Sequence, residues 1–147
     1  MANFHIRTAI AVGAIGILAL SAGGCSTSSD ADVQQAAVDY LSAADAGNHE
    51  RYCDLSVDGH ENRAKCLAFS RDANDVPGLA GEPKAIQVQD WNGGKAVVVE
   101  VVLKASQGVP RYRVLGLVEL DDQWVVDNPG KYLNTRPDDA AVNQALA

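Results

Sequence analysis

The chain has 147 residues and a formal net charge of −7, with 19 acidic against 12 basic side chains and 47% hydrophobic residues. This length suits one domain with one core, and the apolar content is that of a folded protein rather than a disordered stalk. The acidic balance argues against binding to nucleic acid and against adhesion to anionic lipid headgroups.

The first 24 residues have the three-part order of a secretory signal. Arg7 lies in a short polar start, an apolar stretch runs over residues 9–20, and small residues occupy positions 22–24. The apolar stretch is shorter than the roughly 20 residues that a spanning helix needs, and no later segment is long enough. We therefore expect residues 1–24 to be a signal peptide and the mature chain not to span a membrane.

A cysteine, Cys25, follows the small residues directly. The order Ala22-Gly23-Gly24-Cys25 resembles a bacterial lipobox, although a larger aliphatic residue is commoner at the position of Ala22. The resemblance implies cleavage before Cys25, a diacylglyceryl thioether on its sulfur, and stable anchoring on the outer face of the cell membrane. Residues 25–32 are then the lipidated cysteine and a flexible polar tether. Simple secretion and an uncleaved anchor are the alternatives.

The mature chain opens with a predicted helix. Apolar residues recur at spacings of three and four from Val33 to Ala44, the pattern of a helix that buries one face. Asp30 or Asp32 can cap its start, and Gly47 suits the position just past its end.

Two shorter helical segments are predicted next, over residues 48–56 and about 61–71. Each contains one cysteine, Cys53 or Cys66. With Cys25 lipidated, these two form an even pair in an exported chain, which favours a disulfide between the segments. The second segment places three apolar residues on one face: Ala64, Leu67 and Ala68.

After a loop rich in Gly and Pro, the hydrophobic period changes to two. Ile86 and Val88 alternate with glutamines, which predicts a strand with one wet face, and Asn92–Gly94 is a hairpin signal. Four hairpin-linked strands are expected, over 84–91, 95–104, 111–120 and 124–128. Their buried face needs a cover, for which the N-terminal helices are the only candidates. Residues 129–147 are expected to be a C-terminal tail that frays or forms a helical turn or two.

The expected fold is therefore α+β, with N-terminal helices packed on a curved antiparallel sheet of about four strands over residues 33–128. This order resembles the NTF2-like superfamily, in which bent strands wrap the first helix into a cone. The helix entering "YCDLS", the second cysteine Cys66 and the closing "DDQWVVDN" resemble, more narrowly, small actinobacterial lipoproteins with NTF2-like domains. Four strands instead of five or six imply a shallower pocket.

Candidate catalytic groups are few. NTF2-like enzymes such as ketosteroid isomerases and polyketide cyclases place an acid/base carboxylate in the cone, and Glu100 and Asp90 are the weak candidates here. Glu100 shares a side of its strand with Val98, whereas Asp90 lies beside the hairpin turn. The sequence contains no GxSxG elbow, P-loop, HExxH motif or dinucleotide fingerprint.

The remaining polar and aromatic residues have ordinary structural interpretations. His49 and His60 lack the spacing of zinc ligands and are expected on the surface, and neither a metal nor a cofactor is predicted. The "RYR" at 111–113 is interpreted as protection of a strand edge. Trp91 and Trp124 are interpreted as anchors in the core or at its rim.

Three functions from different classes follow. The leading prediction is a lipid-tethered, non-enzymatic binding or accessory domain of the cell envelope, whose partner is a small apolar ligand, a cell-wall component or another envelope protein. A structural or inhibitory envelope protein without a ligand is the first alternative. A small enzyme of isomerase or cyclase type is the second, and it requires Glu100 or Asp90 to line a deep pocket.

Overall fold

A computed structural model describes residues 29–72 and 78–147. The predicted signal peptide, Cys25 and most of the predicted tether lie outside these residues, as does part of the loop at 74–83. Among the described helices, none has the length and apolar character needed to cross a membrane.

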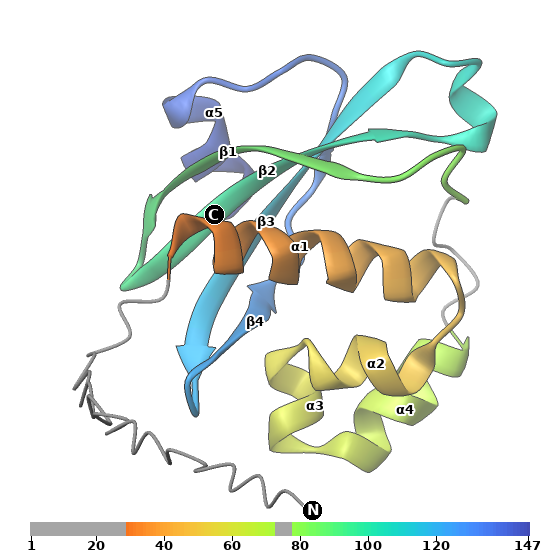
Figure 1. The fold of residues 1–147 in the computed structure, drawn as a ribbon, viewed down its shortest axis with the longest axis vertical. Helices are drawn as coiled ribbons and strands as arrows, with labels where there is room; N and C mark the ends of the chain where they lie inside the picture. Colours follow the sequence, from red (N-terminus) through yellow and green to blue (C-terminus); the bar gives the residue numbers. More distant parts are fainter. Residues whose placement is uncertain (1–28, 73–77) are drawn as a thin grey trace, which may run out of the picture.

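Four helices come first and an antiparallel sheet follows (Figure 1). The helices are α1 (Asp30–Asp45), α2 (His49–Asp54), α3 (Val57–Glu61) and α4 (Arg63–Asp72). The later elements are β1 (Lys84–Trp91), β2 (Gly94–Val102), a 3-10 turn (Lys104–Ser106), β3 (Pro110–Leu120), β4 (Gln123–Asn128), β5 (Tyr132–Leu133) and α5 (Asp139–Ala145). The strand order β1-β2-β3-β4 confirms the predicted meander, and β5 adds a short strand beside β3. The fold is α+β, as expected.

Helix α1 begins before the residues expected to start it. Ser29 is its cap, and its hydroxyl accepts a hydrogen bond from the backbone N–H of Asp32. In return, the backbone N–H of Ser29 donates to the Asp32 carboxylate at 2.9 Å. These bonds from Ser29 also lower the pKa of Asp32. The predicted aspartate caps were therefore wrong, because Asp30 lies in the first turn and Asp32 completes a capping box. Helix α1 with its cap Ser29 therefore begins within residues 25–32, the range expected to be a flexible tether.

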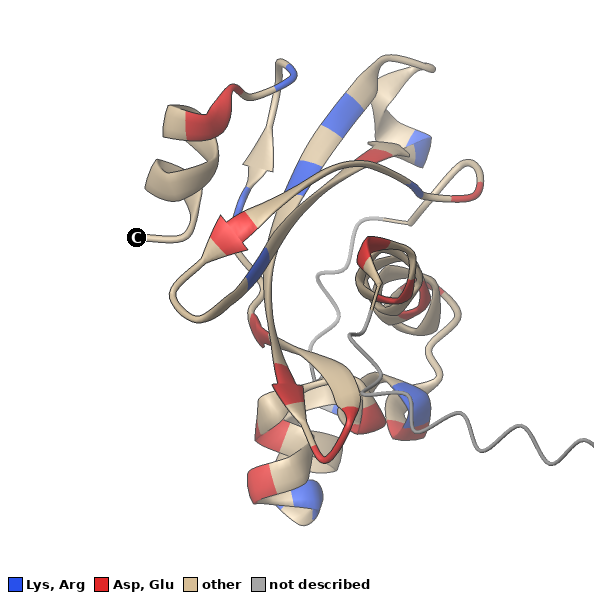
Figure 2. Ribbon diagram, turned by 60° about the vertical axis from the view of Figure 1, so that its left-hand side comes forward, with Lys and Arg blue, Asp and Glu red and all other residues tan. Residues whose placement is uncertain are grey.

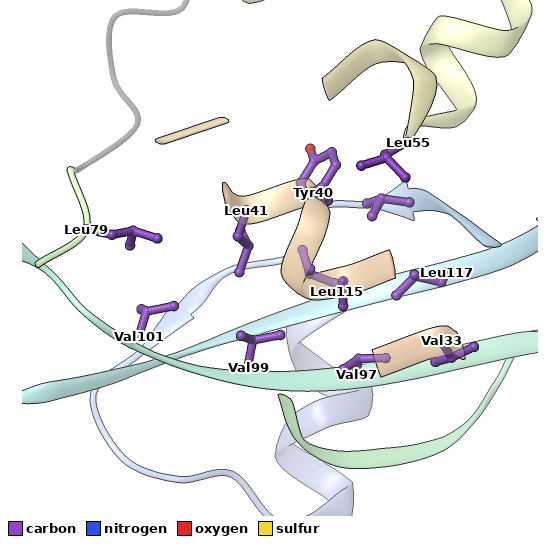
Figure 3. Close-up of a cluster of buried hydrophobic side chains, with 12 residues drawn as sticks. Val33, Tyr40, Leu41, Leu55, Leu79, Val97, Val99, Val101, Leu115 and Leu117 are labelled. Atoms are coloured by element: carbon purple, nitrogen blue, oxygen red, sulfur yellow. The ribbon is translucent and has the colours of Figure 1, made fainter. Parts of the chain in front are cut away.

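The sheet curves around α1, which Figure 2 shows nearly end-on. The buried face of α1 packs on alternate residues of the two central strands, and these side chains form the larger core (Figure 3). Its main members are Val33, Ala37, Tyr40, Leu41, Val97, Val99, Val101, Leu115 and Leu117. This confirms the predicted apolar stripe of the first helix. The same packing buries Val97 and Val99 of the β-branched run in β2, while Ala96 and Val98 lie on the opposite face of the sheet.

The helices α2, α3 and α4 form a small unit closed by the predicted disulfide. Cys53 in α2 is bonded to Cys66 in α4. Helix α3, which the sequence pattern did not indicate, begins at the cap Ser56 and passes close to α2. A Cβ on Gly59 would lie 1.8 Å from the carbonyl oxygen of Cys53, so only glycine fits there. The face of α4 with Ala64, Leu67 and Ala68 is not its buried face. Among the described side chains of this helix, Cys66 and Ser70 are buried.

A bulge interrupts the alternation of β1. The pairing of β1 with β2 shifts register between Ala85 and Gln87. Val88 therefore packs in the core on the α1 side, whereas Ile86 packs on the opposite face. The expectation that Ile86 and Val88 share one face was wrong, because one extra residue reverses the side on which all later side chains lie.

The C-terminal segment covers the face of the sheet that lies away from α1. Helix α5 packs on this face and forms a second core with the sheet. Its buried members are Ala96, Val98, Val114, Val142, Ala145 and Leu146. At the rim of this contact, Gln87 Nε2 donates to Asp139 Oδ1 at 2.9 Å. Helix α5 confirms the helical turn or two expected in the C-terminal segment. The expectation that this segment lies outside the domain was wrong, and so was the expectation that only the N-terminal helices cover the sheet.

Removing α5 by ending the chain at residue 138 should therefore destabilise the domain strongly. Burial of a large aliphatic side chain contributes about 1.5–3 kcal/mol, and both Val142 and Leu146 would be lost. We expect the free energy of unfolding to fall by roughly 3–6 kcal/mol in urea titrations. Gln144→Ala on the exposed side of α5 is the control and should stay within about 0.5 kcal/mol of the wild type. An unchanged urea midpoint in the truncated chain would show that α5 is not part of the folded unit.

Candidate functional site

Four polar and aromatic side chains gather on the α1 side of the curved sheet. They are Tyr40 from α1, Tyr52 from α2, Arg113 from β3 and Tyr132 from β5, here called the tyrosine–arginine cluster. Arg113 pairs in register with Val99 on one side and with Tyr132 on the other. Because paired residues of neighbouring strands share a face, Arg113 and Tyr132 lie on the face that packs on α1.

The two helix tyrosines are stacked and hydrogen-bonded. Their ring centres are 4.7 Å apart, and the Tyr40 hydroxyl donates to the Tyr52 hydroxyl at 2.8 Å. Tyr40 is only 4% exposed. Burial, with a smaller contribution from Tyr52, raises the pKa of Tyr40. Tyr40 is thus a neutral hydroxyl at any physiological pH, and it orients Tyr52.

Arg113 is a half-buried cation packed on an aromatic ring. Its guanidinium carbon lies 4.4 Å from the centre of the Tyr132 ring. Its Nε is buried and has no hydrogen-bond partner, and among the described residues no carboxylate lies within ion-pair distance of it. A charge that is partly removed from water and has no counter-ion costs folding free energy, whereas each ion pair that the structure describes has at least one well-exposed member.

The charge of Arg113 reaches both neighbouring tyrosines. Burial raises the pKa of Tyr132, and the Arg113 cation opposes this rise. The same cation opposes the rise at Tyr40. The negative charge of Asp58 raises the pKa of Tyr40, and that of Asp45 raises the pKa of Tyr132. The cluster therefore combines one cation, three aromatic rings and two acids at its margin.

A surface hollow of about 520 Å³ lies against Tyr52, between α2, α3 and α4. Asp58, Glu61 and Lys65 line it, and so does Phe69, which is 66% exposed. Since Tyr52 bonds to Tyr40, this hollow adjoins the tyrosine–arginine cluster.

The two predicted catalytic carboxylates lie elsewhere and apart. Glu100 is half-buried on the α5 face, in register with Tyr112, and so faces away from α1. Asp90 is 91% exposed and accepts from Lys95 Nζ at 2.7 Å, a bond that lowers the pKa of Asp90. Neither carboxylate lies in the tyrosine–arginine cluster.

The "RYR" segment does not protect a strand edge. It lies in β3, which pairs with β2 on one side and with β4 and β5 on the other. Arg111 donates to the side chain of Asn134, while Arg113 enters the cluster. The edge interpretation was wrong because β3 is central. Arg113 lies two residues before Leu115 and four before Leu117, so the period of two places its side chain on the same inward face. No sequence signal indicated Tyr132 as its neighbour.

The other singled-out residues have structural roles. His60 is exposed and lies 3.1 Å from the Asp54 carbonyl oxygen, and His49 is half-buried at the start of α2. Trp91 packs on Gly116, where a Cβ would lie 2.4 Å from the indole ring, and Trp124 packs against the core on the α1 side. Within the described residues, no group of three or more His, Cys, Asp or Glu side chains could hold a metal ion.

The buried Tyr40 hydroxyl predicts a loss of stability at alkaline pH. Because the folded-state pKa of Tyr40 is raised above its unfolded value near 10, the folded chain keeps a proton that the unfolded chain releases. The contribution of Tyr40 to stability should be constant below pH 10 and fall above it, by up to about 1.4 kcal/mol per pH unit. Urea unfolding between pH 9 and 11 measures this slope. Tyr40→Phe should reduce it, leaving the part due to the raised pKa of Tyr132, and an identical slope in this variant would contradict the assignment to Tyr40.

The cluster has the chemistry of an anion-binding site. A guanidinium against an aromatic ring can hold an anion, whereas the cluster contains no nucleophile beside a general base. Comparison with known protein families, curated proteins and solved structures finds no match to this chain. The function must therefore be argued from the residues themselves.

Proposed function

We propose that the protein is a lipid-anchored domain on the outer face of the cell membrane, which binds a ligand and catalyses no reaction. The apolar stretch, the small residues and Cys25 support the anchor. The pairing of Cys53 with Cys66 supports an oxidising compartment, since such bonds are rare where thiols are kept reduced.

The unpaired Arg113 carries the binding part of this proposal. Arg113 has no carboxylate partner among the described residues, although the chain contains 19 acidic residues. A half-buried cation without such a partner lowers the stability of the folded state. Such a cost is typical of a group that meets its partner only when a ligand binds. The separation of Glu100 and Asp90 from the cluster supports binding over isomerase or cyclase chemistry.

The start of α1 supports a domain held close to the membrane. Only three residues separate Cys25 from the helix cap Ser29. Four residue steps of fully extended chain span at most about 14 Å. A lipid on Cys25 would therefore keep the first turn of α1 near the headgroups. The curved sheet around α1 is also the geometry that an NTF2-like domain would have.

Native mass spectrometry tests the binding proposal. Residues 26–147, which include every described element, are incubated with an extract of the host's own cell envelope and repurified. We expect a bound small molecule on the wild type and on Arg111→Gln, and none on Arg113→Gln. An empty wild-type domain, or equal retention by Arg113→Gln, would contradict ligand binding at this site and favour the structural or inhibitory alternative.

A further inference from the structure

We infer that the tyrosine–arginine cluster binds a monoanionic carboxylate on a small ligand with an apolar body. This inference rests on the proposed binding function and names the chemistry of its ligand. In the bound state the ligand carboxylate pairs with the Arg113 guanidinium, and the apolar part of the ligand lies against the half-buried rings of Tyr52 and Tyr132.

The need for an anion follows from the surroundings of Arg113. Its Nε is buried without an acceptor, and no described carboxylate lies within ion-pair distance. The Tyr132 ring, 4.4 Å from the guanidinium carbon, covers one face of the group and leaves its edges for hydrogen bonds. Carboxylates bind to these edges through two parallel N–H···O bonds.

The charges around the cluster favour one negative charge over two. Arg113 is the only cation among its four members, and Asp45 and Asp58 lie close enough to raise the pKa values of Tyr132 and Tyr40. Within the cluster a phosphate dianion would meet one cation and two acids, because Arg111, on the same face of β3, is bonded to Asn134. A carboxylate brings a single charge that Arg113 can neutralise. A carboxylate is therefore the better match.

The tyrosines supply an apolar surface and one free proton. Tyr132 lies under the guanidinium, and Tyr40 and Tyr52 are stacked beside the main core. Because Tyr40 donates its hydroxyl proton to Tyr52, the proton of Tyr52 is free for another acceptor. A ligand with an aromatic or aliphatic body would contact the partly buried rings of Tyr52 and Tyr132 while its carboxylate lies at Arg113, since Tyr40 is buried in the core.

Benzoate is a simple probe with this chemistry. We would titrate residues 26–147, uniformly labelled with nitrogen-15, with sodium benzoate at constant ionic strength and follow the Nε–Hε signal of Arg113 by NMR. We expect a saturable shift of this signal. Arg113→Lys should weaken the binding by about tenfold or more, followed through the backbone signals of Val99 and Tyr132, because an ammonium loses the paired hydrogen bonds of the guanidinium.

Two controls make the inference falsifiable. Arg111→Gln, which removes a positive charge two residues away on the same strand, should bind benzoate within about twofold of the wild type. Inorganic phosphate at pH 8 should shift the signal less than benzoate. No saturable shift, equal binding by Arg113→Lys, or tighter binding of phosphate would overturn the carboxylate inference. A ligand found by native mass spectrometry that lacks a carboxylate would also overturn it while leaving the binding function intact.

Discussion

Replacing Cys25 by serine is expected to move the protein from the membrane fraction to the soluble fraction. The lipid of a lipoprotein is carried by a thioether, and the serine hydroxyl cannot form this bond. With two or three acyl chains the wild type should be held stably. Fractionation of host cells, followed by immunoblotting of membranes and supernatant, measures the change.

A neighbouring substitution serves as the control for this experiment. Ser26→Ala changes the residue after Cys25 and leaves the thiol in place, so its membrane retention should equal that of the wild type. Retention of Cys25→Ser on membranes at the wild-type level would refute the lipid anchor.

Removing the disulfide is expected to destabilise the helical unit of α2, α3 and α4. Cys53 and Cys66 are 13 residues apart, and a crosslink closing a loop of this size stabilises by about 3 kcal/mol in the chain-entropy model. In the double variant Cys53→Ala/Cys66→Ala, we expect the melting temperature to fall by roughly 10–15 °C. Calorimetry on residues 26–147 measures this shift.

Thiol titration provides an independent check of the same bond. The unfolded, unreduced wild-type domain should show no reactive thiol, and it should show two after reduction. Two thiols before reduction, or a double variant as stable as the wild type, would contradict a stabilising crosslink between Cys53 and Cys66.

Local patterns sufficed for much of the fold. The stripe from Val33 to Leu41 marks the buried face of α1, since helical spacing alone brings these residues to one side. The turn at Asn92 and Gly93 has positive φ at both residues, as an Asn-Gly pair favours. The even cysteine count likewise identified the bond from Cys53 to Cys66.

Features that depend on the meeting of distant segments could not be predicted. The bulge near Ala85 leaves no trace in a pattern of period two, yet it decides which face Val88 joins. The stretch from Val142 to Leu146 is short and moderately apolar, and its burial depends on a sheet face that no other described helix covers. The tyrosine–arginine cluster joins α1, α2, β3 and β5, so no local motif could mark it.

The mass of the intact protein extracted from its host's membranes tests the central claim most directly. Our account predicts a chain of residues 25–147 that carries a diacylglyceryl group on Cys25, with or without a third acyl chain on the new N-terminus. A chain that still contains residues 1–24, or one that begins at another residue and carries no lipid, would contradict a lipid-anchored domain.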